Sequence, residues 1–347
     1  MKPIFIHAMW RTGSTYVWKK FRDQPRYRAY YEPLHQNLAT AWPATGWVKQ
    51  VRERLRGIVA DGSESATTAM NQTLRHPALE RPYFDEYPLR WRGGVAHFAK
   101  RFSYESYWLD SNADDPALHR YLLHLIAFAS ERHQTPVFQF NRSLLRSGWM
   151  KNSITSTNIL LLRKPIDVWR SFCTLPDYLM ARIAQIVSLN RQHPFLERLA
   201  TAHGIPHHRD RNIRREMQFY TQFHRSQPIA DMYALFYEFY FLTCIYNMHH
   251  ADCVIDMNAI THSATAREAV VDRLAQADID LSLEDCRIPA YSDWSAQERE
   301  WMAYEAAGRE SILQNLPDGF LIPRQRLQGH AACLSPYFID ALGEFTI

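Results

Sequence analysis

A short segment near the amino end, HAMWRTGSTYVW at residues 7–18, carries the residue types of an anion-binding turn. A glycine turn between a strand and a helix exposes backbone N–H groups, which bind phosphate or sulfate together with the helix dipole. Gly13 allows the backbone to approach the anion closely, and Ser14 and Thr15 add hydroxyl donors. Arg11 brings a permanent positive charge and a planar set of donors. The same segment also fits an ordinary corner between a strand and a helix.

The turn does not match the Walker A pattern GxxxxGK[ST], which ATPases and GTPases use to hold nucleotide phosphates. Ala8 stands where the first glycine of that pattern falls, and no lysine stands between Gly13 and Ser14. An ATPase or GTPase of the ordinary kind is therefore disfavoured.

A second candidate for anion binding lies in the segment LLLRKPIDVWRSF. Arg163 stands at the carboxyl end of an apolar run that predicts a buried strand, and Ser171 follows eight residues later in the predicted next helix. Ligands of open α/β sheets bind outside the carboxyl ends of the strands. Arg163 and Ser171 are thus placed to contact a second phosphate, beside the one at the glycine turn.

The pairing of WRTGST with the downstream segment NILLLRKPIDVWRSF resembles the sulfotransferases that use 3′-phosphoadenosine 5′-phosphosulfate (PAPS) and release the 3′,5′-bisphosphate (PAP). The resemblance covers about residues 3–37 and 136–172. It implies a P-loop-like sulfotransferase fold in which Arg163 and Ser171 hold the 3′-phosphate. It also implies that the first loop holds the 5′-phosphosulfate, through Arg11, Thr12, Gly13, Ser14, Thr15 and Tyr16.

Two departures from the family pattern affect what the resemblance implies. Cytosolic aryl and steroid sulfotransferases usually have lysine where Arg11 stands, whereas arginine is more similar to the carbohydrate and bacterial branches. The implied acceptor is therefore a hydroxyl of a carbohydrate or glycolipid. The basic-glycine motif that the family carries for the nucleotide near the carboxyl end is not recognisable, so the adenine contacts stay unassigned.

Glu32 is the candidate general base, because sulfuryl transfer needs alignment, charge stabilisation and removal of the acceptor proton. In YYEPLH it follows a predicted short strand that ends at Tyr30–Tyr31, which places it beside the anion loop. Similar segments in glycan-type and bacterial sulfotransferases carry a glutamate proposed as base. His35 is the substitute, and the alternative for Glu32 is that it only pairs with Arg11 or another local cation. Arg11 would stabilise charge on the transferring group.

The sequence predicts an α/β fold with a central parallel sheet flanked by helices. Buried strands are expected at KPIFIHAM, PVFQFN, TNILLLR and CVIDMNAI, and the first three lead into helices, the second of them into RSLLRSGWM. Arg142 and Arg146 in that segment are within reach of the site, although Arg146 fits a solvated position equally well. An amphipathic helix is expected around residues 118–129, and a helix opened by a capping box from Thr265 to Glu268 follows the last strand.

Organisation along the chain indicates one domain over residues 1–347, with a less regular insertion at about 42–114. The basic segment HRDRNIRREMQFYTQFHR is expected to be helical and is more typical of a solvated helix face than of a polyanion site. The apolar run at 232–248 is short for a membrane span and carries Glu238, so a buried helix is expected there.

Composition limits the class of protein. The net charge of +4 is too small to indicate nucleic-acid binding, and no signal peptide or transmembrane segment is expected. Five cysteines without a CxxC pair favour a reducing compartment, so a cytoplasmic protein is expected. No metal site is expected, because HGIPHHRD has plausible histidine spacing but no carboxylate or cysteine that completes a set.

Three functions follow from these observations. The first is in-line transfer of a sulfuryl group from PAPS to a hydroxyl of a small molecule or glycan, with Glu32 as base. The alternatives are a nucleotide or sugar kinase with a degenerate P-loop, and a non-catalytic protein that binds anions or glycans on the same scaffold. A kinase would depend on magnesium, for which the sequence shows no obvious Walker B carboxylate.

Overall fold

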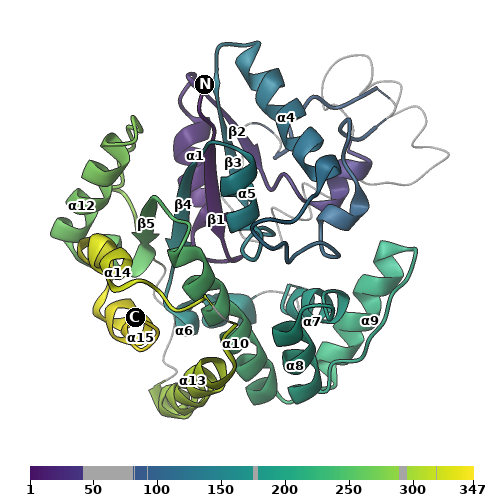
Figure 1. Ribbon diagram of the computed structural model, residues 1–347, viewed down its shortest axis with the longest axis vertical. Helices are drawn as coiled ribbons and strands as arrows, with labels where there is room; N and C mark the ends of the chain where they lie inside the picture. The colour runs from purple at the N-terminus through teal and green to yellow at the C-terminus, as the bar shows by residue number, and fades with distance from the viewer. Residues whose placement is uncertain (42–80, 82, 92, 175–178, 289–294, 318) are drawn as a thin grey trace.

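A parallel sheet of five strands forms the centre of the molecule in the computed structural model (Figure 1). The structure describes residues 1–41, 81, 83–91, 93–174, 179–288, 295–317 and 319–347. The strand order is β2-β3-β1-β4-β5, so β1 lies in the middle. The strands are β1 (Ile4–Ala8), β2 (Tyr27–Tyr31), β3 (Thr135–Phe140), β4 (Thr157–Leu162) and β5 (Cys253–Asp256). The predicted α/β class and the parallel sheet are confirmed.

The strands form where the sequence has short, continuous apolar runs. Every residue of β1 and of β4 is buried, as expected for a parallel sheet that is covered on both faces. The register is regular, with Ile6 opposite Gln139 of β3 on one side and opposite Ile159 of β4 on the other. Because all strands are parallel, their carboxyl ends lie along the same edge of the sheet.

Helices cover both faces of the sheet. On one face Ile4 and Ile6 pack in a cluster with residues of α1 (Ser14–Arg22) and α12 (Ala264–Ala275). On the other face, Phe5 packs with α4 (Pro116–Ser130) and Leu160 with α10 (Ile229–Met248). The other helices of the described residues are α5 (Ser147–Ser153), α6 (Pro165–Cys173), α7 (Ala181–Leu189), α8 (Pro194–Ala202), α9 (Ile213–Arg225), α11 (Met257–His262), α13 (Ser295–Asn315), α14 (Arg324–His330) and α15 (Pro336–Gly343), with short 3-10 turns η1 (Gln36–Ala39), η2 (Lys100–Phe102) and η3 (Ala331–Cys333).

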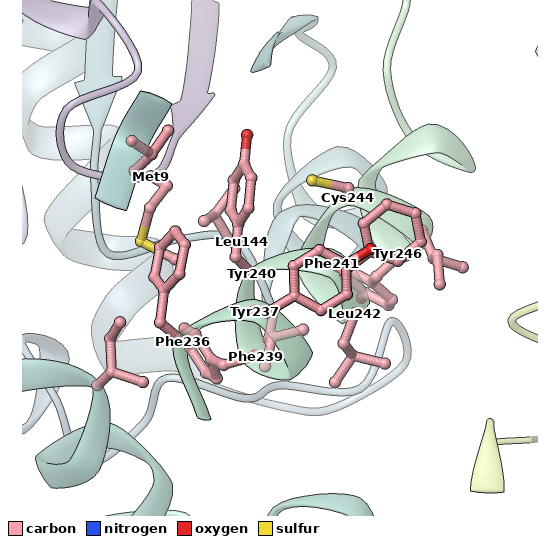
Figure 2. Close-up of a cluster of buried hydrophobic side chains, with 14 of the residues drawn as sticks. Met9, Leu144, Phe236, Tyr237, Phe239, Tyr240, Phe241, Leu242, Cys244 and Tyr246 are labelled. Atoms are coloured by element: carbon pink, nitrogen blue, oxygen red, sulfur yellow. The ribbon is translucent and has the colours of Figure 1, made fainter. Parts of the chain in front are cut away.

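The apolar run that could be mistaken for a membrane span is α10, which lies inside the protein as expected. Its side chains form a large part of the main hydrophobic cluster, shown in Figure 2. Glu238 is partly buried and is held by His203 at 3.2 Å and by Ser311 at 3.0 Å. In the described part of the chain, no helix has the length and apolar character needed to cross a membrane.

Three expected boundaries are wrong, and at two of them a local hydrogen bond decides the helix start. The late strand ends at Asp256, whose Oδ1 accepts from the N–H groups of Asn258 and Ala259 and so starts α11. Ser263, and not Thr265, caps α12, because its Oγ accepts from the N–H of Ala266 at 3.1 Å. The segment after β3 stays a loop until α5 begins at Ser147.

Of the predicted insertion, residues 42–80, 82 and 92 lie outside the described residues. The rest of it, up to residue 114, is built from turns, a bridge between Leu89 and Val95, and η2. The basic segment forms α9, where Arg214 and Arg215 are exposed and Tyr220 is buried, so the expected helix is confirmed. All five cysteines are free thiols. A single domain over the whole chain stays a prediction.

The buried side chain of His7, in the central strand β1, forms a small polar network. The imidazole is fully enclosed between β3 and β4, with Nδ1 2.7 Å from Ser143 Oγ and Nε2 3.1 Å from Asn158 Oδ1. Burial lowers the pKa of His7 to about 4, because the low-dielectric interior disfavours the imidazolium. The folded protein therefore holds His7 neutral at pH values where an unfolded chain would protonate it.

His7 should make stability depend on pH between about 6.5 and 4. In this window the unfolded state binds a proton that the folded state excludes, so the free energy of unfolding falls as the pH falls. Replacing His7→Gln should reduce the slope by up to about 1.4 kcal/mol per pH unit. Urea unfolding at a series of pH values measures it, with the exposed His262→Gln as control. An unchanged slope in His7→Gln would contradict the assignment.

Candidate functional site

The candidate site lies along the carboxyl edge of the sheet, where the chain leaves each strand. The turn with Arg11 follows β1, Glu32 follows β2, Arg142 lies after β3 and Arg163 follows β4. The chain leaves β1 toward α1 on one face, whereas it leaves β4 toward α6, which packs with α10 on the other face. Connections that diverge in this way mark the usual ligand position of an open α/β sheet.

The glycine turn has the tight geometry that the sequence predicts. Gly13 precedes α1 with φ of 89°, in the left-handed region that favours glycine. A Cβ at this position would lie 2.7 Å from the Cε of Met257, so the space beside Gly13 is also restricted. No described side chain caps α1, which leaves the amides of its first turn available to an anion. Arg11 itself has φ of 70°.

The two anion-binding motifs of the sequence come into direct contact. The Nε of Arg11 donates to the Oγ of Ser171 at 2.8 Å, although the two residues belong to different connections. Arg163 completes the link, because its Nη1 donates to the carbonyl of Arg11 at 3.0 Å. The structure thus brings together Arg11, Arg163 and Ser171. The Arg11 guanidinium, which the resemblance assigns to the 5′-phosphosulfate, therefore contacts Ser171, which the resemblance assigns to the 3′-phosphate.

Of the remaining residues of the predicted loop, Thr12, Ser14 and Thr15 lie at the turn. Thr12 stabilises the turn, since its hydroxyl donates to the carbonyl of Met9 at 2.7 Å. Ser14 is buried, and Thr15 Oγ1 lies 3.3 Å from the hydroxyl of Tyr31. These three therefore lie at the turn.

Tyr16 directs its side chain elsewhere. Its hydroxyl donates to Asp285 Oδ1 at 2.7 Å, and the same carboxylate accepts from Lys20. The side chain of Tyr16 is therefore directed away from the glycine turn, and only its backbone N–H faces the start of α1.

Glu32 is a buried and fully engaged carboxylate. It lies directly after β2 with φ of 44° and is only 4% exposed. Asn141 Nδ2 donates to its Oε1 at 2.9 Å, and the guanidinium of Arg142 forms an ion pair with its Oε2. The local cation that pairs with Glu32 is thus Arg142.

Arg142 connects the carboxylate to the insertion. Its Nη2 donates to Gln36 Oε1 at 3.3 Å and to the hydroxyl of Tyr104 at 3.2 Å. The guanidinium also lies over the rings of Trp10 and Tyr104, 5.3 Å and 5.2 Å from their centroids. Among the described residues this network links the ends of β1, β2 and β3, and no pattern in the sequence indicated the pairing of Glu32 with Arg142.

Arg146, for which a solvated position was considered, is instead completely buried. Its Nη2 donates to the carbonyl of Phe102 at 2.9 Å, and its guanidinium lies 5.6 Å from the ring centroid of Tyr107. Burial lowers the pKa of Arg146 to about 9. Its interactions join α5 to the insertion, so Arg146 has a structural role.

His35 is poorly placed to act as a base. Its Nδ1 accepts from the N–H of Asn37 at 3.1 Å and so caps η1. Burial lowers the pKa of His35 to about 4, which keeps the ring neutral. A neutral imidazole that accepts at Nδ1 carries its proton on Nε2, so neither nitrogen is ready to take a proton from an acceptor.

Sequence reasoning missed Asn258, which joins the ends of β5 and β4. Its Oδ1 accepts from the N–H of Lys164 at 2.8 Å, and its Nδ2 donates to Asp167 at 2.7 Å. The predicted strand CVIDMNAI includes Asn258, whereas β5 ends at Asp256, so its position at the strand end was missed. Within the described ranges no three or more His, Cys, Asp or Glu side chains form a group suited to a metal ion.

Comparison with known proteins gives no family for this chain. No model of a known protein family matches it, and no curated protein or solved structure matches it either. The chemistry of the site is therefore argued from its own residues.

The buried ion pair between Glu32 and Arg142 should contribute strongly to stability. Replacing Arg142→Ala leaves a buried carboxylate without its cation, which should lower the free energy of unfolding by about 3–5 kcal/mol. The control is Lys19→Ala, because the exposed pair of Lys19 with Asp23 should contribute less than about 1 kcal/mol. Urea unfolding measures both variants. Equal losses of unfolding free energy in the two variants would show that the buried pair stabilises the protein no more than the exposed pair does.

Proposed function

We propose that this protein is a sulfotransferase that moves a sulfuryl group from PAPS to a hydroxyl group, in a P-loop-like sulfotransferase fold. The observation that carries the proposal is the contact between the two predicted motifs, in which Arg11 binds Ser171 and Arg163 binds the carbonyl of Arg11. An anion with two charged groups needs donors from both motifs in one place. The diverging connections after β1 and β4 support the same position.

The residues of this edge fit the charge of the donor. The uncapped first turn of α1, Arg11 and the hydroxyl of Thr15 would hold the 5′-phosphosulfate. Arg163 and Ser171 would hold the 3′-phosphate, for which a guanidinium and a hydroxyl are suitable donors. When bound, the donor supplies the activated sulfuryl group. Arg11, already against Ser171, lies where it can neutralise charge between the two halves.

Glu32 is the base in this proposal. Its carboxylate is held by Asn141 and Arg142, so its orientation is fixed. An acceptor hydroxyl beside Glu32 would lose its proton to the carboxylate as the oxygen attacks the sulfur, while the bond from sulfur to the bridging oxygen breaks. We propose a carbohydrate or glycolipid hydroxyl as acceptor, on the basis of arginine rather than lysine in the first motif.

Ligand-induced stabilisation tests the donor. Adenosine 3′,5′-bisphosphate, at about 100 times its dissociation constant, should stabilise the protein by about 2.7 kcal/mol, seen as a higher melting temperature. ATP with magnesium serves as the comparison. A larger shift with ATP and magnesium would favour a kinase and overturn the proposal. A shift with the bisphosphate, but no transfer from PAPS to any of a panel of sugar and phenol hydroxyls, would instead indicate a binding protein.

Replacing Glu32→Gln tests the base. Glutamine keeps the size of the side chain and one acceptor oxygen, for either Asn141 or Arg142, but it cannot take a proton, so turnover should fall roughly 10²–10⁴-fold. The dissociation constant for the bisphosphate should stay the same, because the carboxylate does not hold the donor. Glu86→Gln is the control, since Glu86 is also a buried glutamate paired with an arginine, Arg22. Unchanged turnover in Glu32→Gln would remove Glu32 from the mechanism.

A further inference from the structure

A side chain of α10 holds the backbone at the carboxyl end of β4. The paired residues of β4 end at Leu162, so Arg163 lies one position beyond them. The hydroxyl of Tyr240 accepts from the N–H of Arg163 at 3.1 Å and donates to the Arg163 carbonyl at 2.8 Å. One hydroxyl therefore satisfies both backbone polar groups of the residue that leads out of the strand.

Tyr240 is itself fixed in the core. Its side chain is 1% exposed, and its ring stacks on Phe236 with 5.6 Å between centroids and 11° between planes. Figure 2 shows Tyr240 within this cluster, near Met9 and Cys244. Burial raises the pKa of Tyr240 well above its ordinary value, so the hydroxyl stays protonated and can donate and accept at once.

The hydrogen bonds continue from Arg163 to the glycine turn. The guanidinium of Arg163 donates to the carbonyl of Arg11, and Arg11 donates to Ser171. The chain of contacts thus runs from α10 through the end of β4 to the turn after β1 and then to α6. A shift of the Arg163 backbone would change the position of its guanidinium relative to both Arg11 and a bound anion.

We propose that Tyr240 is a positioning residue of the anion site, which acts by fixing the backbone of Arg163 and so directs its guanidinium. This inference rests on the proposed function, in which Arg163 holds the 3′-phosphate. It predicts that the hydroxyl of Tyr240 contributes to the preference for a nucleotide with a 3′-phosphate over one with a 3′-hydroxyl. A role of Tyr240 in packing alone would leave that preference unchanged.

The variant Tyr240→Phe keeps the ring and removes only the hydroxyl. Its affinity for adenosine 3′,5′-bisphosphate should fall about tenfold or more, because a charged contact is misplaced. Its affinity for adenosine 5′-monophosphate should change much less. Isothermal calorimetry measures both. The matched control is Tyr237→Phe on the same helix, whose hydroxyl bonds Arg309 and not the strand end, and its preference should equal that of the wild type.

A double-mutant cycle shows whether Tyr240 acts through Arg163. In an Arg163→Ala background, adding Tyr240→Phe should cause no further loss of preference for the 3′-phosphate, because the group that it positions is absent. Independent, additive losses would overturn the proposal. So would a folded Tyr240→Phe protein with the preference of the wild type.

A crystal structure of Tyr240→Phe separates this inference from the proposed function. Displacement of the Arg163 guanidinium from the Arg11 carbonyl supports the inference, and retention of that contact overturns it, whether or not the bisphosphate binds. If the wild type shows no preference for the bisphosphate, the proposed donor is wrong, and the crystal structure still decides the role of Tyr240. If Tyr240→Phe does not fold, replacement of Tyr240 by 4-fluorophenylalanine fills the volume of the hydroxyl without its donor and gives the same tests.

Discussion

The hydrogen bond from the Arg163 guanidinium to the carbonyl of Arg11 joins the end of the central strand β1 to the end of its neighbour β4, and the arrangement of the site depends on it. It connects two turns that leave the sheet toward opposite faces. The turn after β1 is unusual in its backbone, since both Arg11 and Gly13 have positive φ. Such a turn persists when its surroundings hold it, and here the carbonyl between these residues is held by a charged donor.

The ion pair between Glu32 and Arg142 is a second constraint on the carboxyl edge, and it affects the distribution of charge there. Its negative charge is neutralised by Arg142, which the rings of Trp10 and Tyr104 partly enclose. Arg11 and Arg163 are bonded to a hydroxyl and to a carbonyl, both of which are neutral groups. The carboxyl edge thus carries Arg11 and Arg163 near the first turn of α1, and it carries the carboxylate of Glu32 after β2.

Much of this arrangement could be predicted from the sequence, for a physical reason. Buried parallel strands appear as short apolar runs, and a glycine or a proline after such a run shows where the chain turns. This located β1, β4, Arg11, Gly13 and Arg163 correctly. Helix starts were less well predicted, because single side chains such as Asp256 and Ser263 decide them by local hydrogen bonds. The partners of Glu32 and of the Arg163 backbone could not be predicted, since Arg142 and Tyr240 come from distant parts of the chain.

The side chain of Met257, which follows the edge strand β5, lies beside Gly13, which follows the central strand β1. Met257 opens α11 directly after β5, yet its side chain occupies the space where a side chain at position 13 would lie. A larger residue at position 13 would need both a left-handed backbone and a smaller or displaced neighbour at 257. The residue that a turn near the amino end can carry therefore depends on the side chain of a residue far along the chain.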